Sequence, residues 1–340
     1  MQRETMIRAR RTRAGIAYAV IAGMLFGALS PAVVAAPRDQ AKRIHDRLVG
    51  TPPSEATLNQ MAALISSTND TVGALAAANL AIDRNRVESS PFYNVTLKNF
   101  ATPWTNEEQT VFAPLNDYTA TVIGMVRDDV PFNTVLSDDI LYTASSPGAP
   151  AYSPANNDHY AYLEDNHVDL RSTLQQTTQS SLTGLPPAAT AGVITTRAAS
   201  QAFFILGTNR AMFRFTMLNH MCRDLEQVHD TSRPTDRIRQ DVSRSPGGDS
   251  RLFLNNCVGC HNGMDPMTQA FAYYNFDEAS GRLVYTPGQV QPKYLINSDN
   301  FKTGFVTPDD HWDNYWRSGQ NALLGWSPSL PGRGQGAKSL

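Results

Sequence analysis

Apolar residues recur at helical spacing near the start of the 340-residue chain. Between residues 41 and 83, Leu58, Met61 and Leu64 follow one another at intervals of three, which places their side chains on one face of a helix. A Thr-Pro-Pro sequence at residues 51–53 interrupts the pattern and is typical of a turn. The segment is therefore predicted to form amphipathic helices that serve as scaffold.

Two later segments also have helical spacing. The first begins with a capping box at Thr105 and Glu108 and continues to Val126, and Pro114 is expected to kink or split it. The second extends from about Ala198 to Glu226. Together with the earlier segment, they predict a mainly α fold, with a helical scaffold.

The stretch between these segments differs in composition. Residues 146–200 are rich in Ser, Thr, Pro, Ala and Gly and show little apolar periodicity, which predicts long irregular loops. The chain then divides into an N-terminal segment at 1–36, a helical domain at 37–145, the irregular region, and a C-terminal domain at 201–340.

The N-terminus has the pattern of an export signal. Five arginines within the first 13 residues precede an apolar run at Ala14–Leu29, and small residues continue to Ala36. We expect a signal peptide cleaved after Ala35. The alternative is an uncleaved anchor in the inner membrane, since the apolar stretch is long enough to span a bilayer. Either outcome places the remaining chain in the periplasm or outside the cell, because the arginines hold the N-terminus inside.

Composition narrows the classes of partner. The leader contains five of the 29 basic and one of the 31 acidic residues, so the mature chain has a net charge near −6. This negative charge argues against nucleic acid as a partner. Three cysteines are too few for a disulfide framework.

The sequence Cys-Val-Gly-Cys-His at residues 257–261 is the signature of covalent c-type haem attachment. Positions i, i+3 and i+4 share one face of a helix, so Cys257 and Cys260 could both bond one porphyrin while His261 approaches the iron. The motif thus predicts one covalent haem c, two thioether bonds and a proximal histidine ligand.

The flanking sequence predicts two helices around this motif, which together form a helical haem-binding region. A cap at Asp249-Ser250 opens the first helix, and Asn262-Gly263 is expected to end it. Asp265-Pro266 combines an N-cap with proline at the first helical position, so a second helix is expected to run to Phe276.

Residues 255–282 resemble the haem-binding region of exported proteins, found in planctomycetes and myxobacteria, that carry cytochrome-c-associated domains of unknown function. The likeness rests on the cysteine pair with its histidine, on Met264-Asp265-Pro266, and on a Phe-Asp-x-x-Gly-Arg-like stretch at residues 276–282 that has one extra residue here. The resemblance implies a haem protein with redox activity and no settled substrate.

The sixth iron ligand decides between carrier and catalyst, because a second strong ligand favours electron transfer and a vacant position allows ligand binding or peroxide chemistry. His311 is one candidate, in a helix expected to open at Thr307 and Pro308. Met267 is the alternative. A further group, on the preceding helix, comprises Met212, Met217, His220 and Met221.

The sequence therefore predicts an exported monohaem c-type cytochrome whose partners are redox proteins of the periplasm or membrane. One alternative is a peroxidase-like haem oxidoreductase with an open distal site. Another is a structural zinc module of Cys222, Cys257 and Cys260 with His220, His229 or His261. No hydrolase triad, phosphate loop or nucleotide fingerprint occurs in the sequence.

Overall fold

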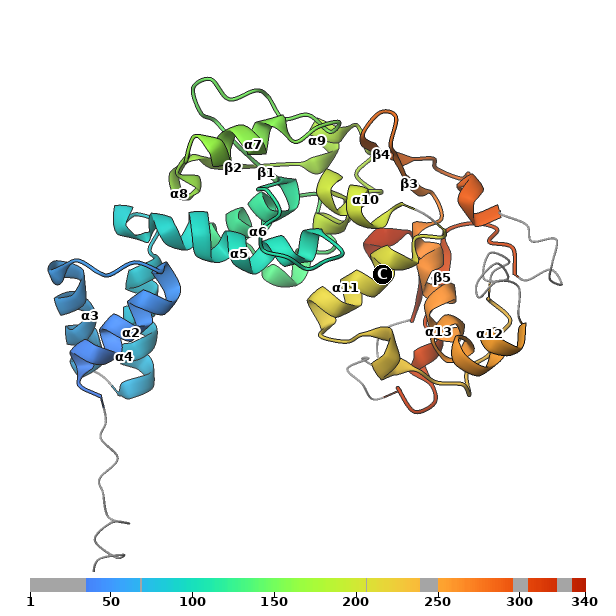
Figure 1. Cartoon of the computed structure of the whole chain (residues 1–340), viewed down its shortest axis with the longest axis horizontal. Helices are drawn as coiled ribbons and strands as arrows, with labels where there is room; N and C mark the ends of the chain where they lie inside the picture. The colour runs from blue at the N-terminus through green and yellow to red at the C-terminus, as the bar shows by residue number, and fades with distance from the viewer. Residues whose placement is uncertain (1–34, 68, 206, 239–249, 296–304, 323–331) are drawn as a thin grey trace, which may run out of the picture. The chain divides into compact units, whose positions relative to one another are not determined.

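Figure 1 shows the chain in a computed structural model, which describes residues 35–67, 69–205, 207–238, 250–295, 305–322 and 332–340. The predicted leader thus lies almost entirely outside the described residues. Helices account for 53% of the structure and strands for 8%, so the predicted mainly α class is confirmed. Among the described residues, no helix combines the length and the apolar character that a membrane crossing requires.

Contacts divide the chain into two compact units. Of the described residues, the first contains those up to Arg47 and those of Pro52–Ala81, and the second contains Leu48–Thr51 and those of Ile82–Leu340. The predicted boundaries after residues 145 and 200 both fall inside the second unit.

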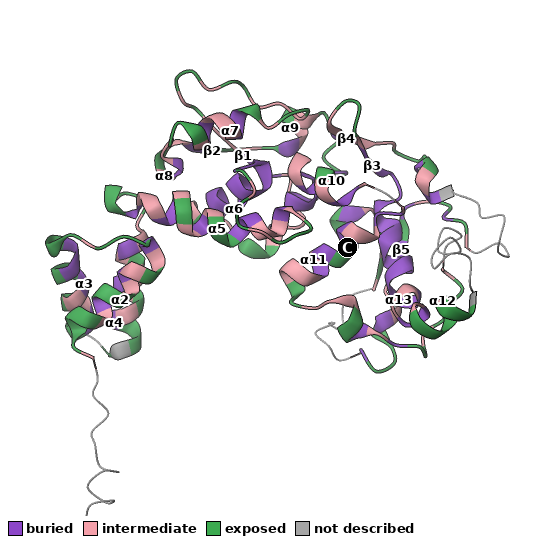
Figure 2. Ribbon diagram, in the orientation of Figure 1, coloured by how far each residue is buried: buried purple, intermediate pink, exposed green. Residues whose placement is uncertain are grey.

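The first unit is built from the helices α2 (Pro37–Val49), α3 (Glu55–Ser67) and α4 (Asp70–Ile82). The helices expected between residues 41 and 83, and the turn at residues 51–53, are therefore present. Each helix contributes buried side chains, as Figure 2 shows, and these include Ala41, Leu58, Met61, Ile65 and Ala77. The spacing of apolar residues predicted the helices but only part of their buried surface, because Leu58 and Met61 are buried whereas Leu64 is partly buried and Leu75 is exposed.

Helix α6 (Asp117–Arg127) lies at the centre of the first half of the second unit, and every residue from Asp117 to Met125 is buried. It packs against α5 (Leu97–Ala101), α10 (Arg197–Phe203) and the strand β1 (Leu141–Ala144). A Cβ at Gly124 would lie 2.1 Å from Cδ1 of Tyr142. Glycine is therefore needed for this strand to approach the helix.

The sequence predicted one helix from Thr105 to Val126, and the predicted start is wrong. Thr105 ends the short 3-10 helix η3 (Thr102–Thr105), and α6 begins only at Asp117. The side chain of Asn116 accepts a hydrogen bond from the backbone N–H of Thr119 at 3.0 Å and so caps α6. Pro114 has no N–H group for an earlier helical turn, and this explains the later start.

The region at 146–200 is more regular than predicted. It contains α7 (Asp158–Asp165), α8 (Leu170–Thr173), β2 (Leu174–Thr177), α9 (Gln179–Thr183) and the 3-10 helix η5 (Gly192–Thr195). Strand β2 pairs antiparallel with β1, with Leu141 opposite Thr177. These elements depend on side-chain hydrogen bonds to the backbone, such as the cap that Asp169 forms with the N–H of Arg171, and apolar spacing does not reveal such bonds.

The second half contains the helices that follow α10. These are α11 (Arg210–Met221), η6 (Leu225–Val228), α12 (Ser250–Asn256), α13 (Val258–Thr268) and η8 (Gln269–Phe271). The single helix expected from Ala198 to Glu226 is thus divided, and α11 starts after Asn209, whose φ of 59° lies in the left-handed region.

Two small antiparallel pairs complete the chain. Strands β3 (Tyr274–Asp277) and β4 (Arg282–Tyr285) form a hairpin, and β5 (His311–Asp313) pairs with β6 (Arg333–Gln335). The single-turn elements near them are η9 (Pro292–Leu295), η10 (Tyr315–Arg317) and η11 (Ala337–Ser339).

Asp117 joins the starts of two helices, and its replacement by Asn is expected to destabilise the fold. Its buried carboxylate accepts hydrogen bonds from the N–H groups of Arg197 at 2.7 Å and Ala198 at 3.0 Å. Because an amide has only one acceptor oxygen, Asp117→Asn should lower the free energy of unfolding by about 2–3 kcal/mol in urea titrations. Asp165→Asn, at an exposed carboxylate, serves as the control, and an equal loss there would contradict this role.

A second prediction concerns His220, which links α11 to α6 by a 2.6 Å hydrogen bond between its Nε2 and the Tyr118 hydroxyl. Burial lowers the pKa of His220 to about 4. The unfolded chain therefore takes up this proton first, and stability should be lost as pH falls from about 6.5 towards 4. In urea titrations, His220→Gln should reduce this loss by about 2–3 kcal/mol. A difference between the two proteins that stays constant with pH would contradict the prediction.

Candidate functional site

The cysteine pair and its histidine lie where α12 meets α13. Cys257 occupies the N-cap position of α13, and its carbonyl accepts hydrogen bonds from the N–H groups of Cys260 at 3.2 Å and His261 at 3.1 Å. These bonds wind the motif into one helical turn. Because residues three and four apart share a helix face, Cys257, Cys260 and His261 point to the same side of α13.

The helix boundaries around this turn differ from those expected. Asp249 lies outside the described residues, and α13 continues through Asn262-Gly263 and Asp265-Pro266 to Thr268 instead of ending and restarting. Phe276 belongs to β3. Gly263 is tolerated in the helix because the Trp316 ring packs onto it, and a Cβ there would lie 2.0 Å from the indole.

Both thiols of the motif are free and half-buried. The Cys260 Sγ lies 3.5 Å from the carbonyl oxygen of Leu225 in η6. Burial, assisted by the negative charge of Glu226, raises the pKa of Cys260. This sulfur is therefore held as an uncharged thiol at neutral pH.

A buried carboxylate holds the imidazole of His261. The His261 Nδ1 lies 3.1 Å from Oδ1 of Asp265, one helical turn further along α13. The Asp265 side chain has no exposed surface, and Arg210 of α11 binds both of its oxygens, through Nε at 2.8 Å and Nη2 at 3.0 Å. Burial alone would raise the pKa of Asp265, but Arg210 and His261 hold it well below its usual range.

This arrangement determines how His261 can act. An ionised carboxylate accepts hydrogen bonds only, so the Nδ1 of His261 is the protonated nitrogen. The Nε2 then carries the lone pair that can bind a metal, and such partners on the other nitrogen are typical of metal-ligating histidines. The ring of Phe253, in α12, lies 5.4 Å from the imidazole between centroids and restricts its movement.

The opposite side of the same turn is covered by protein. The imidazole of His229 packs on Gly259, where a Cβ would lie 2.2 Å from its Nε2. Asp230 donates its backbone N–H to the Gly259 carbonyl at 2.9 Å, and Asn262 donates its amide to the Asp230 carbonyl at 2.7 Å. The turn is therefore fixed to the segment that follows η6, and η6 itself contacts the Cys260 sulfur.

Sequence reasoning missed the partners of His261. Asp265 was interpreted as a helix cap, although its position four residues after a histidine in a helix was a signal for contact. Arg210 lies 55 residues earlier in the chain, and no sequence pattern connects it with the motif.

The two candidate distal ligands lie in different surroundings. His311 belongs to the strand β5, not to the expected helix; its side chain is 61% exposed, and its Nδ1 lies 3.0 Å from Oδ1 of Asp309. Pairing with β6 explains the strand. Met267 is buried in α13, the helix that also carries His261, whereas a distal ligand approaches iron from the other face of the haem.

The remaining candidates belong to other parts of the unit. His220 contacts Tyr118 and Trp104, Met212 and Met217 are buried, and Met221 and Cys222 are exposed. Within the described ranges, no three or more His, Cys, Asp or Glu side chains are grouped so that they could hold a metal ion. The Cys3His ligand set that the zinc alternative requires is therefore not assembled among these residues.

Comparisons with protein-family models, with curated proteins and with solved structures found no match for this chain. The resemblance to the haem-binding region of exported cytochrome-associated proteins stays a prediction, and the argument for function rests on the geometry of the site itself.

Proposed function

We propose that this chain is an exported monohaem c-type cytochrome that transfers electrons. In this proposal Cys257 and Cys260 hold the haem through thioether bonds, and His261 binds the iron through Nε2. The haem would supply a reversible one-electron change at its iron. The chain's own residues would hold, orient and partly enclose it.

The observation that carries the proposal is the contact between His261 and the buried Asp265. A histidine whose Nδ1 is engaged by a carboxylate has a fixed tautomer and ring orientation, with Nε2 directed away from the helix backbone. Arg210 fixes the carboxylate in turn through two hydrogen bonds. A histidine that merely filled space would not need a buried carboxylate and its arginine partner to orient it.

The surroundings of the thiols also fit a haem. Cys257 and Cys260 are free and partly accessible, as thioether formation requires. The adjoining helix α12 exposes two large apolar side chains, Leu252 and Leu254, which are 47% and 60% exposed. A porphyrin has apolar faces of its own and would cover such surface favourably.

The carboxylate also favours a second candidate, a peroxidase-like haem oxidoreductase. A negative partner on Nδ1 makes a histidine ligand more basic and increases its donation of electron density to the metal. Arg210 offsets much of this charge, which is why we favour the carrier. The carrier needs a strong distal ligand, for which His311 and Met267 are the candidates, and the oxidoreductase needs that position open.

A cytochrome of this kind would work in the periplasm or outside the cell, anchored to the inner membrane if the N-terminal segment is retained. Its partners would be redox proteins of the periplasm or membrane. The mature chain's net charge near −6 would favour partners with a positive surface.

Covalent haem attachment is the third prediction. When the chain is exported with the haem-attachment machinery, haem should stay bound on a denaturing gel, and Cys257→Ala or Cys260→Ala should weaken that signal because each removes a thioether. Cys222→Ala is the matched control and should keep full haem staining. Purified protein with stoichiometric zinc and no Soret band would contradict the haem proposal and support the zinc alternative.

Visible spectra of the same preparations separate the two haem functions. Low-spin bands in the reduced protein support the carrier, and high-spin bands support the oxidoreductase. If His311 is the distal ligand, His311→Ala should convert the spectrum to high spin, and Met267→Leu should do so if the ligand is Met267.

The fourth prediction concerns Asp265. Asp265→Asn keeps the shape of the side chain but removes its charge, so His261 should become less basic and the oxidised iron less stabilised. We expect the reduction potential to rise by about 60 mV, which corresponds to a tenfold change in the one-electron equilibrium. Asp277→Asn, in β3, is the control and should leave the potential unchanged. An unchanged potential in Asp265→Asn would contradict the positioning role.

A further inference from the structure

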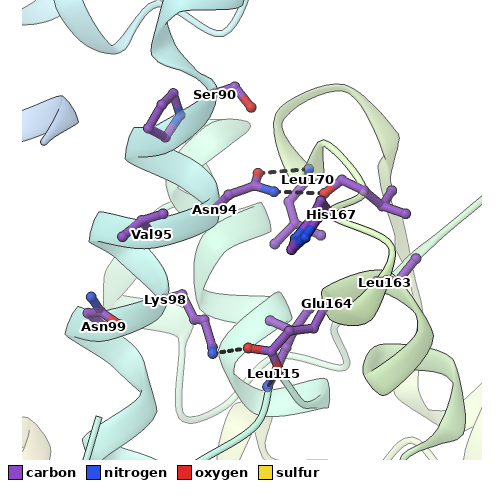
Figure 3. A pocket seen from close by; sticks show the side chains of 12 residues that line it. Ser90, Asn94, Val95, Lys98, Asn99, Leu115, Leu163, Glu164, His167 and Leu170 are labelled. Carbon is purple, nitrogen blue, oxygen red and sulfur yellow. Dashed lines mark hydrogen bonds and ion pairs between the residues drawn. The ribbon is translucent and has the colours of Figure 1, made fainter. Parts of the chain in front are cut away.

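A second candidate site lies in the first half of the second unit, apart from the cysteine motif in the sequence. It is a cavity of about 430 Å³ between two walls, as Figure 3 shows. One wall is the helical stretch formed by the π-helical turn η2 (Phe92–Thr96) and α5, and the other is the end of α7 with the residues up to Leu170. Its volume falls within the range of small-molecule sites.

Two polar bridges hold the walls apart at a fixed distance. The Asn94 side chain donates to the Val168 carbonyl at 2.7 Å and accepts from the Leu170 N–H at 3.0 Å. Further along the cavity, Lys98 forms an ion pair with Glu164. The second oxygen of Glu164 accepts the Leu115 N–H at 2.7 Å. The two walls are thus joined by the protein's own hydrogen bonds and ion pair.

Both walls carry an unusual backbone conformation. The π-helical turn is rare in proteins and occurs frequently at functional sites. On the facing wall, His167 has a φ of 50° at the position after α7 where the chain reverses. Its N–H bonds to the Glu164 carbonyl at 3.0 Å, and the next N–H, of Val168, bonds to the Leu163 carbonyl at 2.9 Å. Glycine is the usual residue at this position of a helix C-terminal turn, so His167 holds a backbone conformation that a side chain does not favour.

The chemistry of the lining indicates the class of ligand. The charges of Lys98 and Glu164 already neutralise each other, so a charged ligand would lose its hydration without gaining an unpaired counter-charge. The side chains of His167 and Asn99 are exposed and can hydrogen-bond to a ligand. Val95 is exposed and Val168 is partly exposed, so these two supply apolar surface, whereas Leu115 and Leu163 are almost fully buried. The lining therefore suits an uncharged molecule with an apolar body and one hydrogen-bonding group.

We propose that this cavity binds an uncharged small organic molecule, with an aromatic or aliphatic body against Val95 and a carbonyl or hydroxyl group that hydrogen-bonds to His167. The site does not depend on the proposed haem. The result of a binding test at this cavity therefore does not depend on whether the electron-transfer proposal is correct.

Fluorine NMR on the purified full chain tests the class of ligand with three probes of the same shape. These are 4-fluorobenzamide, 4-fluorobenzoate and 4-fluorobenzylammonium. The uncharged amide should bind at least tenfold more tightly than either ion, because only the ions must be stripped of a charged hydration shell. Equal or tighter binding of an ion, or no binding of the amide, would overturn the proposal.

The fifth prediction uses His167→Gly to locate the site. Glycine adopts the backbone conformation of residue 167 without strain, so this variant should fold at least as well as the parent and should still bind 4-fluorobenzamide at least fivefold more weakly. Asp129→Gly is the matched control, because Asp129 also has a positive φ, of 54°, and does not line the cavity. Unchanged affinity in His167→Gly, or an equal loss in Asp129→Gly, would overturn the assignment.

Discussion

The fully buried Asp265 is the constraint on which the candidate site depends. One carboxylate joins α11 to α13 through Arg210 and orients His261 on the turn that carries both thiols. Burial of an ionised group is unfavourable unless every one of its acceptor sites is used. Here one oxygen accepts hydrogen bonds from Arg210 and His261 and the other accepts one from Arg210, so the packing of the two helices and the orientation of the imidazole cannot be changed separately.

Close packing covers α13 at two of its glycines. His229 covers the helix at Gly259, and Trp316 covers it at Gly263, in both cases at distances that exclude any side chain. Glycines at these two positions therefore let His229 and Trp316 pack directly on the helix backbone. Gly124 has the same role in α6, where it lets Tyr142 approach. The face with Cys257, Cys260 and His261 is half-buried, and it is the face that the haem proposal uses.

The sequence predicted the parts of the fold that depend on periodic apolar burial or on local covalent spacing. Helices α2 to α4 follow from their apolar spacing, and the shared face of the motif follows from positions i, i+3 and i+4. It did not predict α7 to α9, because side-chain hydrogen bonds to the backbone support this region without apolar periodicity, such as the Asp169 cap of α8 and the bond from the Ser180 N–H to Asp139. It also misplaced the helix around His311, because the strand there depends on pairing with residues more than twenty positions later. Arg210 could not be found for the same reason: long-range contacts leave no local signal.

The cost of burying Asp265 bears on what the site is for. Replacing a buried ion pair by apolar side chains of similar volume is often neutral or stabilising, so stability alone gives little reason to keep Arg210 and Asp265. An apolar pair could still join α11 to α13, but it could not accept the Nδ1–H of His261 and so could not fix which nitrogen faces outward. That difference is of no use to a histidine that only fills space. It matters to a histidine that must present one lone pair in one direction, and the cytochrome proposal assigns this task to His261.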